Sequence, residues 1–525
     1  MTASVALSPA GVDRLRALAL KRLGLRFDEG KSGFLGEVLQ RRLDATGRRV
    51  DDYLFGLEGV DPSLDELRLL AQELTVTETY FFRNIEQLRA FSDVVLTGGA
   101  PGRPHAPLSI LSAGCASGEE AYSLAMLVQA HPTASLNQVD IQAMDINTAM
   151  LKRAQRGRYS AWALRETPSD IQARCFRAEG RDFVLDERFR SMVTFAERNL
   201  IQDDSTFWRP DAFDVVFCRN VLMYFPSEVA SQVVARIARS LRPGGFLFLG
   251  YAETLRGLSQ EFHLLHTHGT FYYQRRHESE RVVHDSALTE PSAWAMRDRP
   301  GDGALGSISP LPAADLSWVE TIRRASERVA SLTTASTHPP GDAQMAAGIE
   351  NPPAPARRAW DLGLAIDLMR QEKFKDALAL VNELPAEAAN DADVLLLRAV
   401  LLTHGGDLAA AEAMCAEVLR LDELSAGAHY LMALCREGAG DRAGATDQDQ
   451  VAAYLDPSFA MPRLHMGLLA RRGGEQATAR RELKEALRLL QGEEASRLLL
   501  FAGGFTRDAL LALCRAELKA SGGAP

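Results

Sequence analysis

Cysteine is scarce in this chain, with six residues among 525. The six are widely scattered and no two form a CxxC pair; they occupy positions 115, 175, 218, 415, 435 and 514. This usage argues against both a disulfide framework and a zinc site. Long apolar runs are lacking too, since none approaches the roughly 20 residues that cross a bilayer, and the N-terminus has no basic-then-apolar signal pattern. We therefore expect a cytoplasmic protein that is not inserted in a membrane.

The chain also lacks an overall positive charge. Its net charge of −10 argues against general nucleic-acid binding. The first 50 residues differ from this average, with ten Lys/Arg against five Asp/Glu. A basic N-terminal module on an acidic protein suggests an acidic partner surface, but from charge alone a solvated helical face is the simpler interpretation.

The length is too great for a single core, so two or three domains are expected. The composition, 46% hydrophobic and 24% charged, is that of an ordinary globular protein. Apolar residues recur at helical spacing through residues 10–95, with Gly24 and Gly47 as expected helix ends. From about residue 105, short apolar runs alternate with helical segments, which predicts a parallel sheet with helices on both faces. The expected strands are Leu108–Ser112, Val139–Ala143, Phe213–Cys218 and Phe246–Gly250, and the expected helices Glu119–Gln129, Thr148–Arg156 and Ser227–Ser240.

The C-terminal part carries an internal repeat of 34 residues. A small residue recurs at this interval in two registers twelve positions apart: Ala365, Ala399, Ala433 and Gly467 in the first, and Ala377, Ala411, Ala445 and Ala479 in the second. Small residues at both positions suit paired helices that cross closely, which predicts a run of four tetratricopeptide repeats. Before this array, the composition of residues 278–355, rich in Ser, Pro and Ala, predicts a flexible linker.

Candidate chemistry gathers at the expected ends of the parallel strands. Residues 112–118 (SAGCASG) follow the first strand, and their glycines allow close approach of a ligand, although this loop lacks the GxGxxG spacing of dinucleotide sites. Asp145 ends the next strand, where an acid suits ribose hydroxyls; the alternative is a helix cap. Glu119 begins the helix after this loop, and its simple structural interpretation is an acidic residue in the first turn of a helix. Asn199 and Asn220 follow two further strands, so three strands deliver polar groups to one edge.

Six segments, read in order, complete the pattern: TVTETYFFR (75–83), LSAGCASGEEAYSLAM (111–126), AMDINTAML (143–151), NL (199–200), FDVVFCRNVLMYF (213–225) and LRPGGFLFLGYAE (241–253). Over residues 20–275 they closely resemble the chemotaxis-receptor methyltransferases (CheR), which use S-adenosylmethionine to methylate glutamate side chains of chemoreceptors. Members with C-terminal repeats resemble those of Wsp-like chemosensory systems. The resemblance implies an N-terminal all-α domain (1–90), a Rossmann-like α/β methyltransferase domain with a small β-subdomain (91–277) and, after the linker, an α-solenoid of tetratricopeptide repeats (356–520).

The resemblance also implies a set of site residues. The residues that bind S-adenosylmethionine would be Thr77, Thr79, Arg83, Ala113, Glu119, Asp145, Asn199, Leu200, Arg219 and Asn220. Arg83 would orient an anionic group and Tyr224 would lie near the transferred methyl, which makes these two the expected catalytic residues. The sequence departs from the family at Thr77, where asparagine is usual, and at Tyr251, where histidine is common.

For the substrate side, the resemblance implies that the N-terminal domain docks on the acidic methylation region of a chemoreceptor coiled coil. Four arginines would serve this docking: Arg41, Arg42, Arg48 and Arg49. The Gly-x-Gly loop with which some members grip a receptor tail is lacking near Arg174–Met192, so we expect no dependence on a tail peptide. The repeats are expected to bind a partner protein or peptide.

Two alternative functions follow from the same residues. One is an adaptor that binds cofactor weakly and acts through its repeats, but an intact set of Arg83, Glu119, Asp145, Asn220 and Tyr224 argues against it. The other is a small-molecule methyltransferase, which the basic helical domain and the repeats disfavour because both suit a macromolecular substrate. The histidines at 263, 266 and 268 lack further ligands in suitable spacing, so no metal site is expected.

Overall fold

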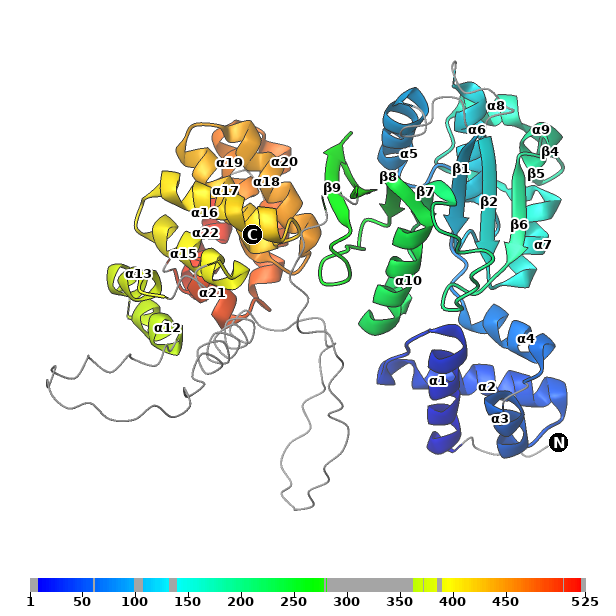
Figure 1. The fold of residues 1–525 in the computed structure, drawn as a ribbon. Coiled ribbons are helices and arrows are strands. Elements are labelled where there is room, and N and C mark those ends of the chain that lie inside the picture. Colours follow the sequence, from blue (N-terminus) through cyan, green and yellow to red (C-terminus); the bar gives the residue numbers. More distant parts are fainter. Residues whose placement is uncertain are drawn as a thin grey trace, which may run out of the picture. The chain divides into compact units, whose positions relative to one another are not determined.

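The computed structural model describes residues 8–59, 62–98, 107–131, 139–277, 280, 362–371, 373–384, 390–503 and 505–520. The chain forms two compact units, Met1–Arg281 and Val282–Pro525, each described here by itself (Figure 1). The predicted linker lies outside the described residues apart from Glu280. Within the described ranges, every helix is too short or too polar to cross a membrane.

The first unit begins with four helices, α1 (Pro9–Leu23), α2 (Ser32–Thr46), α3 (Val50–Glu58) and α4 (Leu64–Leu74). The Ser8 hydroxyl accepts from the Gly11 N–H and caps α1, which has proline in its first turn. As expected, Gly24 and Gly47 end α1 and α2, with φ of 74° and 65°. The helices enclose a small core of leucines around the fully buried Tyr53. Residues 75–84, called the connector below, then lead from α4 into α5 (Ile85–Ala90) and the π-helical turn η2 (Phe91–Leu96).

A seven-stranded sheet follows in the order β6-β2-β1-β7-β8-β10-β9. The first five strands of this order are parallel, and β10 pairs in antiparallel fashion with both β8 and β9. The strands are β1 (Leu108–Ala113), β2 (Val139–Asp145), β6 (Val193–Glu197), β7 (Phe213–Cys218), β8 (Leu241–Leu249), β9 (Phe262–Thr267) and β10 (Thr270–Arg275). Because the strand order reverses beside β1, the loops after β1 and β7 diverge at this edge, where ligands bind in open α/β sheets.

The predicted strands and helices of this sheet are confirmed with small shifts of boundary. The crossover helices are α6 (Glu119–Ala130), α7 (Thr148–Arg156) and α10 (Ser227–Ser240). Strand β8 begins at Leu241 rather than at the expected Phe246, because its pairing with β7 continues through an irregularity in register. Phe217 of β7 and Phe248 of β8 stack at 4.5 Å between ring centroids and help to fix that register.

A small three-stranded sheet is inserted between α7 and β6. It contains β3 (Arg158–Ser160), β5 (Asp182–Leu185) and β4 (Phe176–Glu179), in that order and antiparallel. Three short helices, η4 (Ala161–Leu164), α8 (Ser169–Cys175) and α9 (Glu187–Arg190), accompany it. The β4–β5 turn contains Gly180 at φ 65°.

The second unit is built of paired helices. They are α12 (Leu362–Arg370), α13 (Phe374–Asn382), α15 (Ala392–His404), α16 (Leu408–Leu421), α17 (Ala426–Gly438), α18 (Arg442–Leu455), α19 (Ala460–Arg472), α20 (Gln476–Leu490), α21 (Ala495–Phe501) and α22 (Arg507–Ala520). Gly406, Gly440 and Gly474 occupy equivalent turns at φ of 79°, 84° and 78°. The repeated alanines are fully buried, and a Cβ on Gly467 would lie 2.7 Å from Leu483. The prediction of an α-solenoid of repeats is therefore confirmed.

Candidate active site

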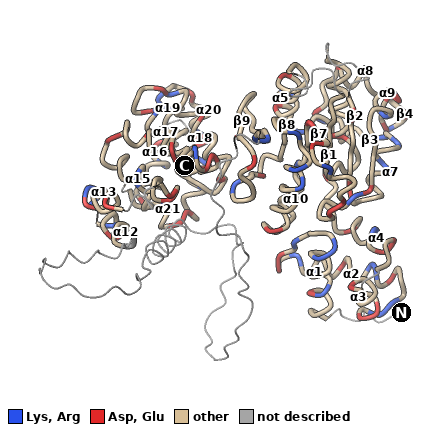
Figure 2. Tube along the Cα trace, in the orientation of Figure 1, with Lys and Arg blue, Asp and Glu red and all other residues tan. Residues whose placement is uncertain are grey.

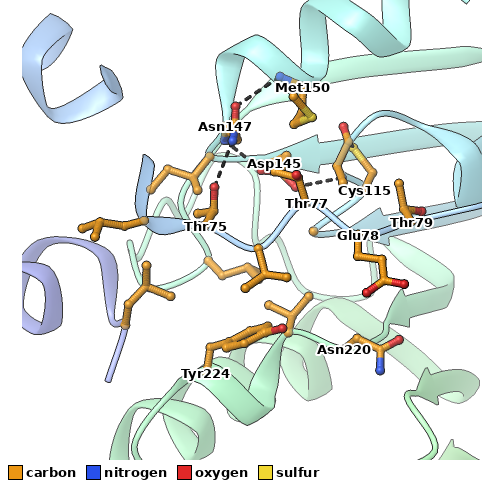
Figure 3. A pocket seen from close by; sticks show the side chains of 18 of the residues that line it. Thr75, Thr77, Glu78, Thr79, Cys115, Asp145, Asn147, Met150, Asn220 and Tyr224 are labelled. Carbon is orange, nitrogen blue, oxygen red and sulfur yellow. Dashed lines mark hydrogen bonds between the residues drawn. The ribbon is translucent and has the colours of Figure 1, made fainter. Parts of the chain in front are cut away.

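A cavity of about 510 Å³ lies in the first unit, at the carboxyl ends of β1, β2 and β7 (Figure 3). Its lining also includes the segment after α1 and the connector that follows α4. The volume is within the range of small-molecule sites. The sequence elements that were predicted to converge on one sheet edge therefore do meet around one cavity.

The loop after β1 forms the floor of this cavity. Gly114 has φ 75°, and a Cβ there would lie 2.4 Å from Val221, so only glycine fits between the β1 and β7 loops. The Gly114 and Cys115 N–H groups donate to the Met144 carbonyl at 2.8 and 3.0 Å. These bonds hold the loop after β1 against the end of β2.

Asp145 ends β2 and lines the cavity. Its carboxylate accepts from the backbone N–H groups of Ala116 at 2.8 Å and Asn147 at 2.7 Å. Burial raises the pKa of Asp145, and these hydrogen bonds oppose the rise. Each oxygen retains a lone pair for a ligand hydroxyl. The helix-cap alternative belongs to Asn147 instead, whose side chain accepts from the first N–H groups of α7.

The connector between α4 and α5 supplies a further part of the lining. Thr77, Thr79 and Arg83 all line the cavity, as do Thr75, Glu78 and Tyr80. Phe81 and Phe82 are buried core residues. Thr75 accepts a 2.9 Å hydrogen bond from the Asn147 amide, so the connector is tied directly to the end of β2.

Arg219 and Asn220 follow β7 and lie on the cavity lining. The Arg219 guanidinium is buried, lies 3.3 Å from Glu120, and donates to the Arg83 carbonyl at 2.6 Å and to Asn84 Oδ1 at 2.5 Å. Burial raises the pKa of Glu120, and the neighbouring guanidinium opposes the rise. Arg219 thus joins the loop after β7 to the connector, in addition to facing the cavity.

Tyr224, Asn199 and Leu200 complete the predicted set at the cavity. Tyr224 is half-buried; burial raises the pKa of its phenol and the Arg83 charge opposes this. The Asn199 amide donates to the Arg22 carbonyl at 2.8 Å, which holds the end of α1 at the sheet edge.

Two predicted residues do not line the cavity. Glu119 is 1% exposed and accepts from the Ser117 hydroxyl at 3.0 and 2.8 Å, and burial raises its pKa. Its neighbour Glu120 lines the cavity instead and accepts from the Ser112 hydroxyl at 2.7 Å. Ala113 is the last residue of β1, and the lining begins at Gly114. In both cases the lining residue is one position beyond the predicted one.

Glu253 is a site residue that the sequence analysis did not identify. Its buried carboxylate accepts from four backbone N–H groups, those of Gly250 at 2.7 Å, Asn220 at 2.7 Å, Val221 at 2.8 Å and Met223 at 3.2 Å. It therefore holds the segment that carries Asn220 and Tyr224, although Glu253 itself does not line the cavity.

Backbone strain concentrates around the cavity. Of the six non-glycine residues with positive φ in the described chain, Phe82, Asn84, Ala116 and Asn220 line the cavity or flank Arg83, with φ between 45° and 59°. Such conformations cost of order 1 kcal/mol each and persist where the surrounding contacts fix them. The hydrogen bonds of Asp145, Arg219 and Glu253 are such contacts.

The docking arginines divide into two groups. Arg42 pairs with Glu66 at 2.8 Å, its side chain is 11% exposed, and a hydrogen bond to Glu66 raises its pKa, so it is used inside the helical domain. This pairing leaves the Arg42 guanidinium less available to a partner than those of the other three arginines, and its docking role stays a prediction. Arg41 lies 2.7 Å from Glu73 and remains half exposed. Arg48 and Arg49 are exposed and take part in no ion pair within the described chain. Figure 2 shows both signs of charge along α1 and α2.

The three histidines of the β9 segment are held by ordinary contacts. His268 Nε2 lies 2.9 Å from Asp93, His263 Nε2 lies 3.3 Å from Glu280, and the His266 ring stacks on Phe271. Among the described residues, no group of three or more His, Cys, Asp or Glu side chains is placed to hold a metal ion.

The polar groups of the cavity fit S-adenosylmethionine. Two buried atoms of lining residues, Arg219 Nε and Asn220 Oδ1, have no hydrogen-bond partner among the described residues. Buried polar atoms are nearly always paired, so such atoms point to a polar ligand. The Asp145 carboxylate suits ribose hydroxyls, and the carboxylate of Glu120 and the guanidinium of Arg83 suit the charged end of an amino-acid moiety.

Comparison with known proteins agrees with this geometry. The CheR methyltransferase SAM-binding domain matches residues 77–271. Chemotaxis protein methyltransferase 2 of Vibrio cholerae is 33% identical over 271 residues, which are 51% of this chain and 93% of that protein. The probable biofilm formation methyltransferases WspC of Pseudomonas aeruginosa and Pseudomonas putida are 28% and 27% identical, over 91% of this chain and 98% and 97% of theirs. The chain belongs to the CheR methyltransferase family, with S-adenosylmethionine as its methyl donor.

Proposed function

We propose that this protein transfers methyl from S-adenosylmethionine to glutamate side-chain carboxylates of a chemoreceptor, giving glutamate methyl esters. The observation that carries this proposal is the cavity itself, whose lining brings Arg83 and Tyr224 together with the strand-end residues Asp145 and Asn220. The names of the relatives, chemotaxis and biofilm formation methyltransferases, support a chemosensory role. A receptor exposes its glutamates on the cytoplasmic side, so we place the protein in the cytoplasm.

The chemistry requires alignment more than acid–base catalysis. When bound, S-adenosylmethionine supplies a methyl group already activated by its sulfonium. A glutamate carboxylate is ionised at neutral pH, so no general base is needed. The residues of the chain need only hold the two reactants in line and keep water out, and such positioning contributes several kcal/mol.

Each cavity residue has a proposed part in this alignment. Asp145 accepts from ribose hydroxyls, and Arg219 and Asn220 bind through the two atoms that lack partners. Thr77, Thr79, Asn199 and Leu200 shape the remaining lining, and Glu120 takes the place first assigned to Glu119. Arg83 orients a carboxylate by charge-assisted hydrogen bonds, while the Tyr224 ring borders the methyl position.

The rest of the first unit is proposed to select the substrate. Arg41, Arg48 and Arg49 of the helical domain face solvent and would attract the acidic methylation region, chiefly raising the association rate. The β4–β5 turn is short and contains the single glycine Gly180, so recognition of a receptor tail peptide is not part of the proposal. The repeats supply a separate protein-binding surface.

Transfer of radiolabelled methyl to receptors in host membranes tests this function. Wild type is compared with Arg83→Ala and with Arg209→Ala, a matched control at an exposed loop residue that lies away from the cavity. We expect base-labile label on a receptor with wild type and Arg209→Ala and a loss of at least tenfold with Arg83→Ala. Cofactor binding without transfer to any receptor would refute the proposal and favour the adaptor function.

A further inference from the structure

The short helix α21 breaks the contact pattern of a linear repeat array. In such an array each helix pair contacts only its neighbours. Helix α21 follows α20 in the chain, yet it contacts α15 and α17, which belong to the second and third pairs (Figure 1). His404 Nε2 lies 3.2 Å from the Leu500 carbonyl, and the Tyr430 hydroxyl donates to the Phe501 carbonyl at 3.4 Å. Thus α21 folds back across the first helices of earlier repeats.

Most apolar side chains of α21 are buried. Leu500 and Phe501 are 4% and 3% exposed. The Phe501 ring packs against Tyr430 of α17 and against Phe459, which precedes α19, with centroids 6.0 and 5.2 Å apart. Two repeats therefore provide one aromatic pocket for a single side chain of α21.

A buried charge fixes the orientation of α21. The Arg497 guanidinium lies 3.1 Å from Asp456 and 3.2 Å from Glu493, donates to the Ser458 hydroxyl at 3.2 Å, and lies over the Phe459 ring. The side chains of Arg497, Asp456 and Glu493 are each less than a tenth exposed. Because Glu493 belongs to the same segment as Arg497, Asp456 is the carboxylate that the earlier repeats present to a basic side chain at this place.

The segment after α21 continues the stack, although Arg507 at the start of α22 donates to the Glu493 carbonyl ahead of α21. Helix α22 packs on α20, and Arg471 of α19 pairs with Glu517 of α22. Gly503, at φ 63°, separates α21 from α22. A seven-residue helix has little stability of its own, because helix nucleation is costly. Helix α21 can therefore leave its place while α22 stays.

We propose that the surface formed by His404, Tyr430, Asp456 and Phe459 is the partner-binding groove of the array, with α21 as its internal occupant. The partner is a protein segment that carries the same chemistry: a short helix with a basic residue followed, three and four positions later, by an aliphatic and an aromatic side chain. This segment displaces α21 from the groove. The partner segment and α21 therefore compete for the same groove.

Peptide binding to the full chain tests this proposal. The probe is a fluorescent peptide of residues 493–503, and the variants are Phe501→Ala and its control Phe505→Ala, whose ring is 59% exposed. We expect Phe501→Ala to bind the probe at least tenfold more tightly than wild type and Phe505→Ala to match wild type. A probe carrying Arg497→Glu should not bind. A folded Phe501→Ala protein with no gain in affinity would overturn the proposal.

Hydrogen exchange of the wild-type chain provides a second test, which decides the matter if Phe501→Ala does not fold. We expect the amides of α21 to exchange at least tenfold faster than those of α17, α19 and α22, because α21 opens by itself. Equal protection of all four helices would mean that α21 is an ordinary part of the stack, and would overturn the proposal.

Discussion

The two units treat their binding surfaces in opposite ways. At the cavity of the first unit, Arg219 Nε and Asn220 Oδ1 lack protein partners, and the loops around them are held in strained conformations by Asp145 and Glu253. At the groove of the second unit, the chain supplies its own ligand, α21. A preorganised site for a small cofactor keeps its polar groups ready. The proposed groove for a protein segment combines aromatic rings with the Asp456 carboxylate, and α21 shields both from water.

The largest change expected on the cavity side comes from Glu253→Gln. The amide retains one acceptor oxygen and turns an NH₂ group toward backbone N–H donors, so the segment with Asn220 and Tyr224 loses its anchor. We expect affinity for S-adenosylmethionine to fall about 100-fold, or about 2.7 kcal/mol, by calorimetry. Glu228→Gln, an exposed acid in the first turn of α10, is the control. Unchanged affinity in Glu253→Gln would show that this segment is held by other contacts.

A smaller loss is expected from Asp145→Asn. The amide oxygen still accepts one hydrogen bond, but the charge that favours ribose hydroxyls is removed. Affinity for S-adenosylmethionine should fall about tenfold, which corresponds to about 1.4 kcal/mol. Asp140→Asn on the same strand, where the residue is exposed, should bind like wild type. An equal loss in both variants would point to a general effect on β2.

The smallest expected effect is a pH dependence of the free energy of unfolding of the repeat unit. His465 lies 2.7 Å from Asp449 and 2.8 Å from Glu437, and its pKa is raised to about 9 by hydrogen bonds to both carboxylates, against the effect of burial. Burial raises the pKa of Asp449 to about 7, so Asp449 is already largely ionised at pH 8. The pKa of His465 is higher in the folded chain than in the unfolded chain, where it is near 6.5, so protonated His465 stabilises the fold. This stabilisation is complete below pH 6.5 and is lost as the pH rises through 9.

We therefore expect the free energy of unfolding of the repeat unit to fall by about 1 kcal/mol between pH 8 and 10. Urea denaturation followed by circular dichroism measures it, with His465→Gln as the variant that should lack this dependence. Cofactor affinity, measured over the same range, should not depend on His465. A pH dependence that His465→Gln leaves intact would assign it to other groups.

Short-range patterns predicted most of the fold. The strand and helix limits near the cavity follow from local apolar runs, and the 34-residue register follows from buried alanines such as Ala433 and Ala445. The apolar runs depend on a few neighbouring residues, and the register depends on a spacing that can be counted directly in the sequence. The repeat register gives no information on α21, because no small residue continues it beyond Ala479.

Most residues predicted for the site line the cavity, and the differences between the predicted and the lining residues have physical causes. Glu119 and Glu120 differ by about 100° around the helix axis, and packing against Ser117 turns the first away from the cavity. Three of the four partners of Glu253 are backbone N–H groups some 30 residues earlier, which leave no mark in the sequence. The charge count that suggested Arg42 for docking does not show its partner Glu66.

The most direct test of the central claim is to locate the transferred methyl group. The full chain is incubated with S-adenosylmethionine carrying a deuterated methyl and with receptor-containing membranes, and the receptor is digested for mass spectrometry. We predict deuterated methyl esters on glutamate side chains of the receptor's cytoplasmic region, removable by mild base. Label on another residue type, or none on any receptor while the cofactor is bound, would contradict the account.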